Sequence, residues 1–121
     1  MSIQKIPLGA SEGGIAEEVT NANGTAVKFE SGLMICKHEL SVPAITASFG
    51  TLFRSSSAAT WTFPQVFVGD SPSVSGNDKN SSQVWGGFSS NLTSATATGV
   101  FIQSLSGSRT FVLTAIGRWK A

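Results

Sequence analysis

The ten residues from Thr110 to Trp119, close to the C-terminal end, constrain the fold of this chain more than any other stretch. In an extended strand the side chains alternate between two faces, and here both faces carry apolar groups. We therefore predict a central strand that is covered on both faces, rather than an edge strand with one face exposed to solvent. Chain ends fray unless the fold holds them, so this end should be docked in the middle of the core. The two predicted faces are Phe111, Leu113 and Ala115 on one side, and Val112, Thr114 and Ile116 on the other.

Short strand-like runs separated by turn sequences continue through the rest of the chain. Asn23-Gly24 and Ser31-Gly32 are typical turn sequences, and Pro64 places an edge or a kink in the strand that begins near Ala59. We count roughly eight strands at a spacing of about 8–12 residues, which is typical of antiparallel sandwiches. No stretch requires a helix of any length. The predicted fold class is all-β, an antiparallel β-sandwich.

The N-terminal part has a different character. The stretch from Leu8 to Val19 reads as small, flexible and acidic, and Gly13 and Gly14 disfavour more than one short turn of helix after Ser11. We predict that residues 1–22 form a lead-in segment, either a linker to a fibre shaft or a strap on a neighbouring subunit. Residues 23–121 are predicted to form the β-sandwich domain.

Composition narrows the possible partners. Charged residues make up 12% of the chain and the net charge is +1, so no basic field exists to hold nucleic acid. The surface is instead expected to be rich in Ser, Thr, Asn and Gly, which suits carbohydrate contacts and tight subunit interfaces. A single Cys excludes an internal disulfide framework. The sequence shows neither a signal-peptide pattern nor an apolar run long enough for a membrane helix, so we expect synthesis in a cytoplasm and no membrane insertion.

Catalytic and metal-binding patterns are weak. Cys36 and His38 lie two residues apart on one face of a predicted strand, where a Cys-His nucleophile pair is conceivable. A buried thiol beside a structural or interface histidine is the simpler interpretation. Three copies of this pair about a trimer axis could supply ligands for Zn or Fe. The carboxylates that could act on a glycosidic bond are not placed in an evident apolar pocket. We predict no enzyme activity, no cofactor and no metal; the carboxylates considered are Glu30, Glu39, Asp70 and Asp78.

Three blocks of sequence, in the same order, resemble one known family. The first is a hairpin made of residues 23–29, which begin with the Asn23-Gly24 turn, and of Gly-Leu-Met-Ile-Cys at residues 32–36. The second is Trp-Thr-Phe-Pro at residues 61–64, followed by Phe67 and Pro-Ser-Val at residues 72–74. The third is the ending Ala-Ile-Gly-Arg-Trp at residues 115–119. Together they resemble the C-terminal receptor-binding domain of bacteriophage tail-fibre proteins.

The resemblance implies a homotrimer at the tip of a tail fibre that binds a host cell-surface receptor, with a bacterial glycan as the expected ligand. The chain would then be part of the virion, joined to an upstream fibre shaft or other virion proteins. One alternative is a purely structural trimeric fibre or capsid-decoration domain. Another is a carbohydrate-binding module of a secreted enzyme, although the absence of a signal-peptide pattern and the Ala-Ile-Gly-Arg-Trp ending disfavour it.

The candidate receptor site is the most polar stretch of the chain. Residues 75–82 are predicted to form an exposed loop, and loops on a rigid scaffold are where binding residues concentrate. Trp61 and Trp85 can each belong to the core, to an interface or to a stacking surface for sugars. Trp85 follows the loop directly, so it is included in the site. If the loop is not the contact surface, the loop at residues 54–57 is the next candidate. The predicted receptor-binding residues are Asn77, Asp78, Lys79, Asn80 and Trp85.

Overall fold

The computed structural model describes residues 14–121, and this part of the chain consists of β-strands, turns and loops without a helix. Every strand pairing is antiparallel, so the all-β antiparallel prediction is confirmed for these residues. No helix in this range could cross a membrane. The strands are β1 Ile15–Asn21, β2 Gly24–Phe29, β3 Leu33–Val42, β4 Ile45–Phe49, β5 Leu52–Ser55, β6 Ala59–Thr62, β7 Ser73–Asp78, β8 Trp85–Ser90, β9 Ser94–Phe101 and β10 Arg109–Arg118.

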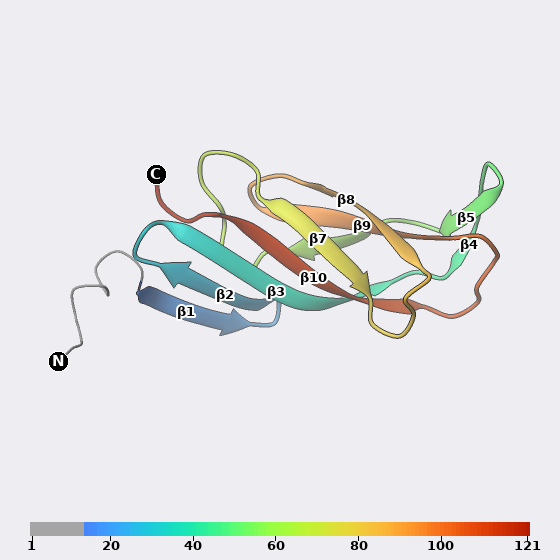
Figure 1. Cartoon of the computed structure of the whole chain (residues 1–121), viewed down its shortest axis with the longest axis horizontal. Helices are drawn as coiled ribbons and strands as arrows, with labels where there is room; N and C mark the ends of the chain where they lie inside the picture. The colour runs from blue at the N-terminus through green and yellow to red at the C-terminus, as the bar shows by residue number, and fades with distance from the viewer. Residues whose placement is uncertain (1–13) are drawn as a thin grey trace.

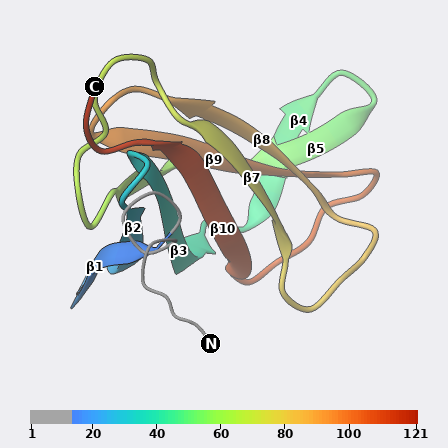
Figure 2. The same ribbon diagram turned by 60° about the vertical axis from the view of Figure 1, so that its left-hand side comes forward.

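The strands form two five-stranded sheets (Figure 1). The first sheet has the order β1-β2-β3-β10-β7. In the second sheet, β9 pairs with β8 along one edge and with both β5 and β6 along the other, since Val100 and Ala97 each have partners on two sides. The β4–β5 hairpin extends this sheet and projects from the rest of the strands (Figure 2).

Strand β10 is central, as the alternation of its residues predicts. It lies between β3 and β7, and its inner side chains Phe111, Leu113 and Ala115 are fully buried. The opposite face is not covered within one chain, because Val112 and Thr114 are only partly buried and Ile116 is 44% exposed. The prediction of a strand covered on both sides is therefore wrong for the single chain.

Side chains from both sheets meet in one hydrophobic cluster. Trp61 of β6 is 1% exposed, its indole N–H donates to the carbonyl of Asn23 at 2.7 Å, and Phe63 meets its ring edge-on. The open question about Trp61 is thus decided in favour of the core. The cluster includes Met34, Cys36, Phe111, Leu113 and Ala115 from the first sheet, and Ile45, Trp61, Ala95 and Ala97 from the second.

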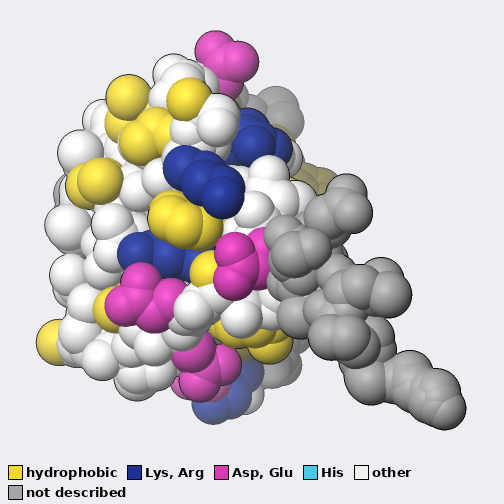
Figure 3. Space-filling model, turned by 90° about the vertical axis from the view of Figure 1, so that its left-hand side faces the viewer, with side chains coloured by type: hydrophobic (Ala, Val, Ile, Leu, Met, Phe, Trp, Pro, Cys, Tyr) yellow, Lys and Arg dark blue, Asp and Glu magenta, His cyan; other side chains and the backbone are white. Residues whose placement is uncertain are grey.

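The C-terminal end is held by Trp119 and Gly117. The Trp119 ring nitrogen donates to the carbonyl of Phe29 at 2.8 Å, and the ammonium groups of Lys28 and Lys120 lie 5.2 and 5.1 Å from its ring centroid. A side chain at Gly117 would come within 2.7 Å of the Phe67 ring, so this glycine permits a close approach. Figure 3 shows this end of the molecule, where basic, acidic and hydrophobic side chains are mixed rather than gathered by sign.

The N-terminal boundary of the folded part differs from the prediction. Ile15–Asn21, which were assigned to the lead-in segment, form strand β1 at the edge of the first sheet and pair with β2. Glu17 in this strand forms an ion pair with Lys28 at 2.8 Å. An exposed edge strand with carboxylates resists pairing with other chains, which explains its acidic composition. Residues 1–13 of the predicted lead-in segment lie outside the described range, and so does the start of the predicted helical turn at Ser11.

Candidate functional site

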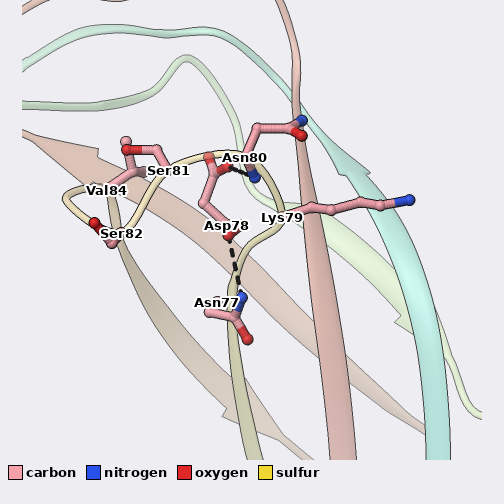
Figure 4. Close-up of a pocket in the computed structure, with 7 residues that line it drawn as sticks. All are labelled: Asn77, Asp78, Lys79, Asn80, Ser81, Ser82 and Val84. Carbon is pink, nitrogen blue, oxygen red and sulfur yellow. Dashed lines mark hydrogen bonds between the residues drawn. The ribbon is translucent and has the colours of Figure 1, made fainter.

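The connection from β7 to β8 passes from the first sheet to the second and encloses an open hollow of about 500 Å³ (Figure 4). Its lining is polar except for Val84. Four of the five residues predicted to bind a receptor contribute to this lining, so the structure brings them together. The lining residues are Asn77, Asp78, Lys79, Asn80, Ser81, Ser82 and Val84.

Asp78 is the buried anchor of this connection. Its carboxylate accepts a hydrogen bond from Arg109 Nε at 2.7 Å and another from the backbone N–H of Asn80 at 2.8 Å. Burial alone would raise the pKa of Asp78, but the hydrogen bonds from Arg109 and from the N–H groups of Asn80 and Ser81 outweigh it and lower the pKa. The carboxylate therefore stays ionised and serves to hold the turn in place.

This placement corrects the predicted loop. Ser75–Asp78 belong to strand β7 and only the following residues form the loop. Asp78 is 3% exposed, so its carboxylate is occupied by internal partners and does not face a receptor. Arg109 was not predicted from the sequence, because 31 residues separate it from Asp78 and no local pattern links them.

The other three predicted residues that line the hollow, Asn77, Lys79 and Asn80, are exposed. Asn77 donates a side-chain hydrogen bond to the carbonyl of Asp78 at 3.1 Å. Lys79 forms an ion pair with Glu39 at 2.9 Å, and its side chain points away from Ser81 and Ser82 in Figure 4. The Asn80 side chain is exposed at the rim, which makes Asn80 the best placed of these residues for contact with a ligand.

Trp85 lies outside the hollow. It is the first residue of β8, is 54% exposed, and pairs with Val100 of β9 on the outer face of the second sheet. The structure therefore decides against a core position for Trp85. The buried Val84, directly before it in the chain, lines the hollow, but Trp85 itself does not.

Cys36 and His38 do not form a reactive pair in the described chain. Cys36 is fully buried, and burial raises the pKa of its thiol to about 11, against a smaller lowering by a backbone hydrogen bond from Gln65. A thiol in that state is a poor nucleophile. His38 stacks on Trp61 with ring centroids 5.9 Å apart. Since Cys36 points into the core, it cannot be a shared ligand between subunits, and residues 14–121 contain no cluster of three or more potential metal ligands.

A second hollow, of about 190 Å³, adjoins the loop at residues 54–57 and is lined by Arg54, Ser55, Ser56, Ser57, Ala58 and Thr98. Ser55 is buried and its hydroxyl accepts the Gly99 N–H at 2.8 Å, which fixes the loop to β9. Arg54 is exposed, and its guanidinium lies over the Phe49 ring at 5.2 Å. Thr98 was not singled out in the sequence, although the alternation in β9 places it on the outer face.

Comparison with known proteins gives no relative: no protein-family model, no curated protein and no solved structure matches this chain.

Proposed function

We propose that this chain is the tip domain of a bacteriophage tail fibre, a component of the virion that binds a glycan on the host cell surface. In this proposal the two sheets form a β-sandwich and three copies assemble as a homotrimer. The domain binds without catalysing a reaction. The proposal is supported by the three sequence blocks described above and by the all-β antiparallel architecture.

The observation that carries the proposal is the polar surface at the β7–β8 connection. The Asp78–Arg109 pair fixes the backbone of the turn, and the exposed Asn80, Ser82 and Lys79 side chains rest on that fixed backbone. A rigid scaffold that presents amide and hydroxyl groups loses little entropy when it binds a polar ligand. Such groups recognise the hydroxyl groups of sugars well, and the exposed indole of Trp85 adds a stacking surface nearby.

Trimer formation is supported by the uncovered face of the first sheet. Val27, Ile35 and Ile116 are paired across β2, β3 and β10, so they form one apolar row on that face. Burying such a row between subunits would remove it from water. The same row also favours the second candidate, a purely structural fibre or capsid-decoration domain, if the polar loops bind nothing.

Attachment to bacterial cells tests the proposal. Fluorescently labelled protein should bind some strains of a broad bacterial panel, and pretreatment of those cells with periodate, which cleaves sugar diols, should abolish binding. Asn80→Ala and Trp85→Ala should weaken attachment, Trp85→Ala by about tenfold, with little change in the melting temperature. Val66→Ala alters another exposed apolar residue and serves as a control. A folded trimer that binds no strain would favour the structural role.

A further inference from the structure

The outer face of the second sheet carries a second arrangement suited to a ligand. Strand registers place Arg54, Val100 and Trp85 in one row across β5, β9 and β8. A parallel row consists of Thr60, Thr96 and Ser89 across β6, β9 and β8. The hydroxyl groups of Ser89 and Thr96 are 2.6 Å apart, which confirms that the two side chains share this face. The face thus combines an exposed indole, a guanidinium and a line of hydroxyl groups.

Gly87 keeps the surface beside Trp85 bare. It lies between Trp85 and Ser89 on the same face of β8 and pairs with Thr98. A Cβ at Gly87 would meet nothing closer than the Thr98 carbonyl at 4.0 Å, so packing does not require a glycine there. The neighbouring Gly86 differs, because a Cβ there would lie 2.5 Å from the Phe88 ring. Gly87 therefore leaves open space next to the indole that any side chain would occupy.

Arg54 is the only charged residue in the strands of the second sheet. Among residues 14–121 no carboxylate lies within ion-pair distance of Arg54, and none of these residues accepts a hydrogen bond from its side chain. Its guanidinium rests on the Phe49 ring and borders the hollow formed by Ser56, Ser57 and Thr98. A guanidinium fork with free donors beside hydroxyl groups is suited to bidentate recognition of a carboxylate.

From these observations we propose that the outer face of the second sheet binds an acidic glycan. A sugar ring stacks on Trp85 over the space left by Gly87, and a carboxylate of the same glycan pairs with Arg54. Since β9 lies between these residues, their backbones are about 10 Å apart, so the ligand spans more than one sugar unit. The positive charge of Arg54 complements an anionic ligand, and the strands of this sheet carry no carboxylate. The inference rests on the proposed glycan-binding function and specifies the ligand class and the surface that binds it.

A microarray of acidic bacterial polysaccharides tests this inference, with each polysaccharide also printed after its carboxyl groups have been reduced to alcohols. The full chain should bind at least one acidic form and bind its reduced form about tenfold less. Arg54→Gln and Gly87→Thr should each lower binding to the acidic form by a similar factor, and thermal melts should show both variants folded. Arg54→Gln should bind the acidic and reduced forms alike. Lys120→Gln, which removes a cation at the other end of the molecule, should bind as the unmodified chain does.

The possible contrary outcomes separate the inference from the proposed function. Equal binding to acidic and reduced forms, unchanged by Arg54→Gln, overturns the inference and leaves glycan binding standing. Binding to no polysaccharide of the array overturns the inference, and the proposed function falls with it only if labelled protein also attaches to no bacterial strain. If Gly87→Thr or Arg54→Gln instead lowers the oligomeric mass in light scattering, the face is a contact between copies of the chain and the inference is overturned.

Discussion

The carboxylate of Asp78 and the guanidinium of Arg109 lie 2.7 Å apart and join the end of β7 to the start of β10. The two strands are neighbours in the first sheet, and the backbone N–H of Lys79 also donates to the carbonyl of Thr110 at 2.8 Å. The Asp78 side chain is completely buried, whereas that of Arg109 remains 21% exposed. The pair therefore fixes the turn from which the candidate receptor loop departs.

Replacing Asp78 should destabilise the fold. Asp78→Ala leaves Arg109 without its partner and the N–H groups of Asn80 and Ser81 without an acceptor. Because Arg109 is partly exposed, we expect a loss of about 2–4 kcal/mol in the free energy of unfolding, measured by urea denaturation. Lys79→Ala removes the exposed Lys79–Glu39 pair and should cost less than about 1 kcal/mol. Equal effects of the two changes would contradict the anchoring role of Asp78.

The same pair predicts a dependence of stability on pH. The pKa of Asp78 is lower in the folded chain than its ordinary value of 3.8, so the folded state favours the ionised carboxylate. Its stabilising contribution is therefore present above the unfolded-state pKa, and it is lost as the pH falls below that value toward the folded-state pKa. In the unmodified chain, the urea concentration at the midpoint of unfolding should decrease as the pH is lowered below about 4. In Asp78→Asn, the part of this acid-induced loss of stability that is due to Asp78 should disappear. If the loss of stability with falling pH is the same in the variant, it is caused by other carboxylates.

The two faces of β10 should respond differently to truncation. Leu113→Ala removes a fully buried side chain and should cost about 2–5 kcal/mol of unfolding free energy. Ile116→Ala, on the same strand but 44% exposed, should cost less than about 1 kcal/mol in a monomeric state. Deletion from Thr110 onward should abolish folding, since it removes a central strand of the first sheet. A cooperative thermal melt of the truncated chain would contradict the central role of β10.

Self-association should depend on the apolar row of the first sheet. Light scattering at micromolar concentration should give three times the 12.6 kDa of one chain. Ile116→Asp places a charge in the row formed with Ile35 and Val27, and should shift the mass toward that of a monomer. Ile102→Asp introduces the same charge at another exposed isoleucine and should leave the mass unchanged. A monomeric unmodified chain would exclude the trimer.

Local patterns were sufficient to predict the antiparallel all-β fold and the central position of β10, because alternation and turn chemistry are properties of neighbouring residues. They were not sufficient for β1, whose acidic and glycine-flanked sequence lacks apolar alternation. Its place in the sheet depends on pairing with β2. The exposed outer face of β10 was also missed, since alternation reports which side chains share a face and not what covers that face.

The burial and the contacts of the site residues depended on tertiary structure even more than the fold did. Trp61 and Trp85 look alike in sequence, yet one is 1% exposed and the other 54%, because the pleat of each strand turns one inward and the other outward. From the local sequence Asp78 resembles an exposed loop residue. Its buried ion-pair role depends on Arg109, which is 31 positions away in the chain. The row of Arg54, Val100 and Trp85 exists only through the registers of β5 and β8 on β9. Sequence determined which residues alternate and where the chain turns; the long-range pairing of strands decided which of them are buried and which polar groups meet.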